Sequence, residues 1–182
     1  MKPAKSKIVF IYFLLFSTSF TVSARERDEV WVGVEKNHPA ASSCNDFASS
    51  KMGFLLGYYH PIIEDWSASV AVQFKNFREK QLEEDFSFLT ASQGIYYNLR
   101  LAYPTYLQVG GKLLYLLPVT KASLPVERKR EYANEIGASI VVGLRHPFSD
   151  RMSVGVYLER WRGTKTMMFH GIETLLVFGY GI

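Results

Sequence analysis

Charged and amide side chains recur at alternate positions in several segments of the chain, among small residues such as Gly and Ser. Because successive side chains of a β-strand point to opposite faces, this alternation places such a set on one face of a sheet. Buried charges are tolerated when they are paired. If this face lines the interior (lumen) of a closed sheet, the expected chemistry is a lumenal network of ion pairs and hydrogen bonds. Its expected members are Gln73, Lys75, Asn98, Arg100, Lys112, Glu135, Arg145, Glu159 and Glu173.

Two of these carboxylates could carry proton or ion chemistry. If the connection between their strands is short, Glu159 and Glu173 lie nearly opposite each other on one face. They would then repel each other or share a proton unless a cation intervenes. A structural network is the alternative to a proton or ion path. We favour the structural network, because a barrel of eight strands is filled by side chains and leaves no aqueous channel.

Nucleophilic catalysis has one candidate set in the first long polar stretch. His38 stands near Ser42, Ser43 and Asp46, residue types that could supply a base, a nucleophile and an orienting acid. The same composition is typical of a solvated loop, which is the interpretation we favour.

The other histidines and the cysteine offer no clear catalytic or metal site. His60 and His146 are predicted at short turns, and no serine stands two residues from His170. No histidine has a second His or Cys at ligand spacing, and the single Cys44 excludes an internal disulfide. We therefore expect no catalytic residue, no metal and no cofactor.

Eight segments of alternating apolar sequence must position these side chains. They cover about residues 28–36, 51–60, 66–74, 95–103, 107–115, 136–144, 152–158 and 172–182. One face of each is apolar and the other is small or charged, and a transmembrane barrel is apolar outside and polar inside. The predicted fold class is all-β, an eight-stranded antiparallel up-and-down transmembrane β-barrel.

The connections between these segments alternate in length. Residues 60–65, 104–105 and 147–151 form short turns that contain proline. Longer polar stretches cover 37–50 and 118–130, with an acidic stretch at 79–85 and a short connection at 162–165. This pattern predicts short periplasmic turns on one rim and longer extracellular loops on the other. Aromatic residues expected in an interfacial girdle on the short-turn side are Tyr58, Trp66, Tyr103, Tyr106 and Tyr180.

The first 24 residues have the pattern of a cleaved signal peptide, leaving 25–182 as the barrel domain. Three lysines precede an apolar run, and small residues end at Ala24. Removing three lysines and no acids lowers the formal charge from +4 to +1. The basic character therefore resides mostly in the signal, and no nucleic-acid partner is predicted.

The signal peptide, the eight alternating segments, the turn pattern and the aromatic closing segment 176–182 together resemble the small eight-stranded outer-membrane barrels. This class includes the OmpA membrane domain, the OmpX/Ail group and the lipid A-modifying barrels. The resemblance is architectural and covers all of the expected mature chain. It implies a bacterial outer-membrane location, with outer-membrane lipid, lipopolysaccharide and the barrel-insertion machinery as partners. Basic residues that could contact lipopolysaccharide phosphates are Arg128, Lys129, Arg130, Arg160, Arg162 and Lys165.

Three functions are open at this point. The leading hypothesis is a non-enzymatic outer-membrane barrel whose surface loops, chiefly 118–130, contact the surroundings or stabilise the envelope. One alternative is a lipid A-modifying enzyme of the deacylase kind. The other is a soluble periplasmic barrel that carries a ligand, which requires apolar residues inside and Lys75, Arg100, Lys112 and Arg145 in water.

Overall fold

The computed structural model describes residues 27–39, 48–63, 65–79, 85–119, 134–164 and 170–182. The strands, in chain order, are β1 (Glu29–Pro39), β2 (Ala48–Ser50), β3 (Met52–Ile63), β4 (Trp66–Glu79), β5 (Asp85–Ala102), β6 (Thr105–Pro118), β7 (Glu135–Pro147), β8 (Met152–Gly163) and β9 (His170–Gly181). The short β2 and the longer β3 both pair with β4, one after the other along its length. β2 and β3 therefore share one position in the ring, and the nine labelled strands make eight strand positions, called staves below.

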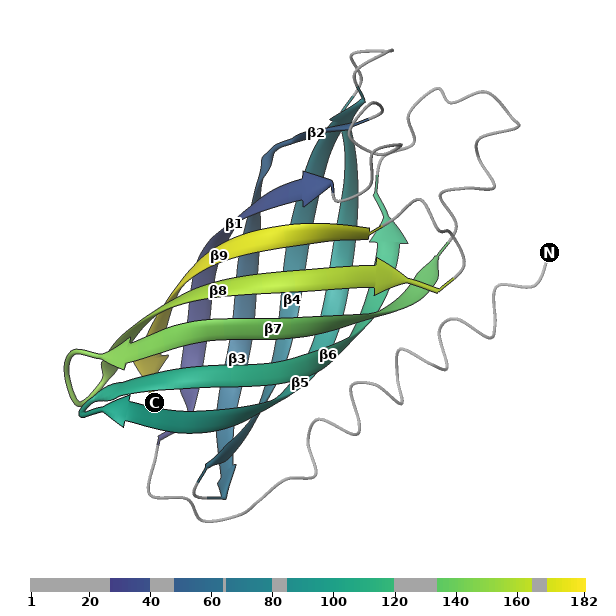
Figure 1. Ribbon diagram of the computed structural model, residues 1–182. Helices are drawn as coiled ribbons and strands as arrows, with labels where there is room; N and C mark the ends of the chain where they lie inside the picture. Colours follow the sequence, from purple (N-terminus) through teal and green to yellow (C-terminus); the bar gives the residue numbers. More distant parts are fainter. Residues whose placement is uncertain (1–26, 40–47, 64, 80–84, 120–133, 165–169) are drawn as a thin grey trace.

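The staves close into a barrel in which every pairing is antiparallel. Each strand from β3 to β9 pairs with the next one along the chain, and β1 closes the ring by pairing with both β3 and β9. Figure 1 shows the closed, tilted barrel, with β1, β9 and β8 side by side. The predicted eight-stranded up-and-down architecture is confirmed. Within the described residues, no helix is long and apolar enough to cross a membrane.

The two faces of each strand differ as the alternation predicts. Apolar side chains point outward, and Phe54 and Ile140 are 61% and 70% exposed. Polar side chains point inward, and Gln73, Lys75 and Glu159 are fully buried. The soluble-carrier alternative requires the opposite arrangement, which the structure does not have.

Tight connections lie at one rim of the barrel. Ile63 pairs with Trp66 and Ala102 with Thr105, and β7 and β8 are joined through a turn at 148–151. The Tyr103–Pro104 peptide bond is cis. The connections at the opposite rim, 40–47, 80–84, 120–133 and 165–169, lie outside the described residues.

One predicted strand is much longer in the structure. The strand expected to begin near residue 95 begins at Asp85, and the strand expected to end near residue 74 extends to Glu79. The connection between them is therefore 80–84, close to the acidic stretch expected at 79–85. Phe88 points inward and Leu89 outward, so both faces are apolar there and the alternation is hidden. The lumen accommodates Phe88 at this height because other buried apolar side chains pack against it there.

Candidate functional site

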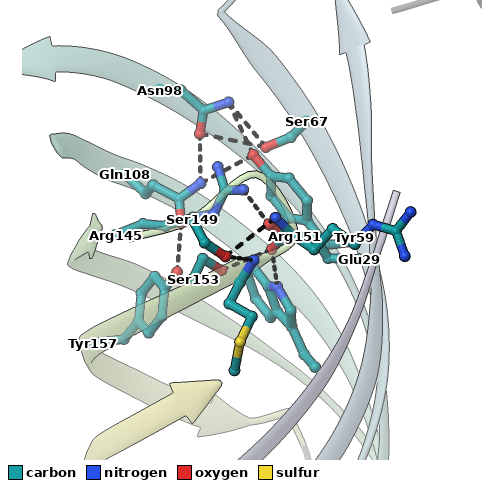
Figure 2. A network of polar contacts seen from close by, with 12 residues as sticks. Glu29, Tyr59, Ser67, Asn98, Gln108, Arg145, Ser149, Arg151, Ser153 and Tyr157 are labelled. Carbon is teal, nitrogen blue, oxygen red and sulfur yellow. Dashed lines mark hydrogen bonds and ion pairs between the residues drawn. The ribbon is translucent and has the colours of Figure 1, made fainter. Parts of the chain in front are cut away.

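The lumen at the short-turn end holds a buried acid surrounded by donors (Figure 2). Arg145 Nη2 donates to Glu29 Oε1 at 2.5 Å. Ser153 Oγ and Trp31 Nε1 donate to Glu29 Oε2 at 3.0 and 2.9 Å. The Arg145 guanidinium also lies 4.8 Å from the ring centre of Tyr59. These contacts join β1, β7, β8 and β3 across the barrel and give the Glu29 carboxylate a donor on each oxygen.

Amides and hydroxyls continue this network across the lumen. Gln108 Nε2 donates to Asn98 Oδ1 at 2.6 Å and to Tyr59 Oη at 3.2 Å. Tyr157 donates its hydroxyl to Gln108 Oε1 at 2.5 Å, and Asn98 Nδ2 donates to Ser67 Oγ at 3.2 Å. Figure 2 shows Gln108 at the centre of this group, between Asn98 and Tyr157. The short-turn end of the lumen is therefore filled by a connected set of hydrogen bonds.

A charged layer lies further toward the loop end. Lys112 Nζ is 2.5 Å from Glu159 Oε2, and Lys75 forms an ion pair with Glu173. Lys75 Nζ also lies 3.9 Å from Glu35 Oε1, on β1. All five side chains are at most 5% exposed, so the layer is closed to bulk solvent.

The charged layer contains more acceptors than donors. Three carboxylates face two lysines, and among the described residues no donor reaches Glu159 Oε1 or Glu173 Oε2. The amide oxygens of Asn37 and Gln73 are likewise buried without a described donor. Both amides instead donate to Glu35, with Gln73 Nε2 3.0 Å from Glu35 Oε2. Glu35 thus binds its neighbours through three contacts, and the other two glutamates each depend on a lysine.

An apolar layer covers the charges on the loop side. It consists of Phe77, Phe88, Leu114, Leu116 and Trp161, all buried. Trp161 lies 6.4 Å from Phe77, and Phe77 lies 6.3 Å from Phe88, between ring centres. Lys75 Nζ is 5.4 Å from the Trp161 ring centre, so this layer rests directly on the charged one. The sequence analysis did not predict it, because it assumed a polar lumen throughout.

Solved structures of low sequence identity share this architecture. Neisserial surface protein A matches with a TM-score of 0.61 at 12% identity, over 85% of this chain and 97% of that one. Ail of Yersinia pestis matches with a TM-score of 0.55 at 13% identity, over 86% and 99%. The outer membrane protein OprG of Pseudomonas aeruginosa matches with 0.53 at 11%, over 86% and 94%. The fold is that of the small outer-membrane β-barrels. No protein-family model matches the sequence, and no curated protein matches it significantly.

Eight of the nine residues expected in the lumen of the barrel are buried there: Gln73, Lys75, Asn98, Lys112, Glu135, Arg145, Glu159 and Glu173. Glu135 lies at the loop end, where a side chain in place of Gly163 would collide with its carboxylate. The prediction for Arg100 was wrong. Its side chain is exposed, with the guanidinium 5.1 Å from the Tyr103 ring centre. The pairing of β5 with β6 shifts register between Arg100 and Ala102, so the alternation ends there.

Sequence reasoning missed the inward residues of β1. Glu29, Glu35 and Asn37 are buried in the lumen, on the face opposite Val30. The signal was present, because these residues alternate with the valines that define the outward face. Each contacts a group from another part of the barrel or from its own strand, as described above.

The remaining candidates are divided between the outer surface and the undescribed loops. Arg160 and Arg162 are exposed on β8, whereas Arg128, Lys129, Arg130 and Lys165 lie outside the described residues. His38 is exposed at the end of β1, and its expected companions Ser42, Ser43 and Asp46 also lie outside. Within the described ranges, no group of His, Cys, Asp or Glu has a geometry that could hold a metal ion.

The two turn-side histidines have partners that tie strand ends together. His60 Nδ1 lies 2.6 Å from Asp28 Oδ1, and Asp28 also accepts a hydrogen bond from the Tyr58 hydroxyl. His146 Nδ1 lies 2.9 Å from Thr105 Oγ1. Burial raises the pKa of the Asp28 carboxyl. The hydrogen bonds from Tyr58 and His60, with the charge of His60, outweigh burial and hold that pKa below its ordinary value of 3.8.

Proposed function

We propose that this chain is an integral, non-enzymatic protein of the bacterial outer membrane, a sealed barrel whose loops interact with the envelope or with external molecules. One observation carries the proposal. The exterior of the barrel is covered by apolar side chains, while charged and amide side chains are buried inside it, together with apolar ones such as Trp31 and Trp161. A soluble protein places these two classes the other way round. A lipid bilayer is the solvent that this surface fits.

The apolar exterior extends over all the staves. Outward residues such as Val32, Leu56, Val72 and Ile95 are each roughly half exposed, far beyond the isolated apolar residues of a soluble surface. Aromatic residues stand at the short-turn end, where Trp66 lies 5.3 Å from Tyr97 between ring centres and both are exposed. Aromatic side chains with one polar atom favour the boundary between hydrocarbon and water.

The filled lumen supports a structural role over transport. The amide network, the charged layer and the apolar layer follow one another along the barrel, with no side chain of the charged layer more than 5% exposed. Eight strands enclose just enough space for side chains. Interaction through the loops is then the remaining use of a rigid barrel, because loops on a rigid scaffold are common sites of binding.

The proposal is tested by expressing the full chain, separating membrane fractions and comparing boiled with unboiled samples by gel electrophoresis. We expect recovery with the outer membrane and a mobility shift on boiling. In planar bilayers, the purified barrel should show no steady conductance. Recovery in the soluble periplasm would overturn the membrane location, and stable channels would overturn the sealed lumen.

A further inference from the structure

The exposed charges on the barrel exterior differ between its two ends. At the short-turn end both signs occur, in Arg27, Asp65, Arg100, Asp150 and Arg151. In the loop-side half, the exposed titratable side chains that the structure describes are all basic: Lys36, His38, Arg78, Arg160 and Arg162. Glu35, Glu135, Glu159 and Glu173 of that half point into the lumen. Among the side chains that the structure describes, the outer surface near the loops is therefore basic, even though the whole chain is nearly neutral after the expected loss of its signal.

Four of these residues lie together on three neighbouring strands. His38 of β1 and Arg160 of β8 both pair with Ile172 of β9, one on each side. Lys36 and Arg162 stand two residues from His38 and Arg160 along their strands. With strands about 4.8 Å apart and a rise of about 3.4 Å per residue, the Cα atoms of His38 and Arg160 lie roughly 10 Å apart, and those of Lys36 below them and Arg162 above them lie roughly 17 Å apart. We name Lys36, His38, Arg160 and Arg162 the basic rim patch, and Figure 1 shows its strands side by side.

The basic rim patch has no counter-charge within the described part of the barrel. None of its members forms an ion pair with a described carboxylate. The cations of Lys36, Arg160 and Arg162 therefore favour an anion bound beside them. Lysine and arginine donate strong hydrogen bonds to phosphate oxygens, arginine through two parallel N–H groups.

An apolar surface begins directly below the basic rim patch. Ile172 lies between its two outer strands, Leu158 is level with Lys36, and Leu176 lies below both on the same outward face, all partly exposed. Lysine and arginine side chains extend their charged ends toward water while their stems cover apolar surface. A ligand that fits both parts carries phosphate above and acyl chains below.

We infer that the basic rim patch binds the phosphate groups of lipid A, the membrane anchor of lipopolysaccharide, with the acyl chains against β8, β9 and β1. This inference rests on the proposed outer-membrane function, which places the loop side in the outer leaflet. It adds Lys36 and His38 to the arginines that the sequence suggested, and it defines one site on one side of the barrel.

The test compares two triple variants of the full-length barrel, each folded in phospholipid nanodiscs. The first, Lys36→Gln, Arg160→Gln and Arg162→Gln, removes charge from the patch. The control, Arg27→Gln, Arg100→Gln and Arg151→Gln, removes the same charge from exposed residues at the other rim. Native mass spectrometry titrates lipid A, chemically dephosphorylated lipid A and phosphatidylglycerol. The mobility shift on boiling verifies that each variant is folded.

We expect the patch variant to bind lipid A at least tenfold more weakly, with the control unchanged. Dephosphorylated lipid A should bind the unaltered barrel as weakly as lipid A binds the patch variant. Equal loss in both triple variants would overturn the patch as the site. Equal binding of phosphatidylglycerol would overturn lipid A as the ligand and indicate a general anion surface. Both outcomes leave the membrane location intact, since fractionation tests that separately.

Discussion

Glu159 and Glu173 are register partners on β8 and β9, yet each carboxylate forms an ion pair with a different lysine. Lys112 of β6 binds Glu159, and Lys75 of β4 binds Glu173. The two adjacent carboxylates would repel each other. Each is instead paired with a lysine that reaches it across the lumen from a different strand. The arrangement links β8 and β9 to β4 and β6, strands that are not their neighbours.

Breaking one of these ion pairs should destabilise the barrel strongly. Lys112→Met leaves Glu159 buried without its cation, a change that typically costs about 3–5 kcal/mol. The matched control is Lys36→Met, on the exposed surface, for which we expect an effect within about 0.5 kcal/mol. Reversible urea unfolding in lipid vesicles measures both free energies. Similar values for the two variants would contradict a structural role for the lumenal pair.

The apolar layer should contribute as much as a soluble core does. Trp161→Ala removes a side chain that packs on Phe77 and Lys75, and a buried Trp→Ala change typically costs about 3–5 kcal/mol. Trp66→Ala, at an exposed tryptophan, should cost less. The same urea experiment compares the two variants. A Trp161→Ala barrel as stable as the wild type would show that the lumen above the charges is loosely packed.

The two faces of β7 should respond oppositely to an added charge. Val142 points outward near the middle of its strand, and Val142→Arg should cost about 2–4 kcal/mol at the bilayer midplane. Ser139 points into the lumen, on the strand beside Lys112. Ser139→Lys should be milder, because a third cation can pair with the excess carboxylate of the charged layer. Equal costs, measured by unfolding in vesicles, would be inconsistent with the assigned faces.

Acid should weaken the contact between Asp28 and its two donors. Because the pKa of Asp28 lies below its ordinary value of 3.8, its contribution to stability is present above about pH 4 and is lost as the pH falls further. Asp28→Asn should therefore flatten the decrease in unfolding free energy between pH 5 and about pH 2. Asp150→Asn, in the exposed turn after β7, is the control and should retain the wild-type profile. Parallel profiles for both variants would refute the role of Asp28.

Strand alternation made most of the architecture predictable, because one lipid-facing surface requires apolar residues at every second position. Segment 136–144 has small or polar residues at every other position except Val141 and was placed correctly. The prediction failed where that contrast disappears. Phe88 and Leu89 are apolar on opposite faces, so half of β5 was missed. Arg100 follows the polar parity of Asn98 but lies where the register shifts, and no pattern in the sequence marks that shift.

The lumenal contacts could be predicted by face but not by partner. Alternation indicates that Lys75 and Lys112 point inward, whereas their choice of Glu173 and Glu159 depends on the tilt and stagger of the closed barrel. The apolar layer around Trp161 was hidden for a related reason. Its members come from β4, β5, β6 and β8, and none of these strands shows by itself that the others contribute at the same height.

Ring closure between β1 and β9 has a consequence for assembly. Glu29 pairs with Gly181, and Trp31 pairs with Gly179, so the first stave finds one of its two neighbours only when the last stave is present. The lumenal ion pairs have the same property, since Glu29 meets Arg145 and Lys75 meets Glu173. Contacts this distant along the chain slow folding, because a long loop must close before any of them forms. The barrel therefore cannot close, and its lumenal ion pairs cannot form, before the final strand is in place.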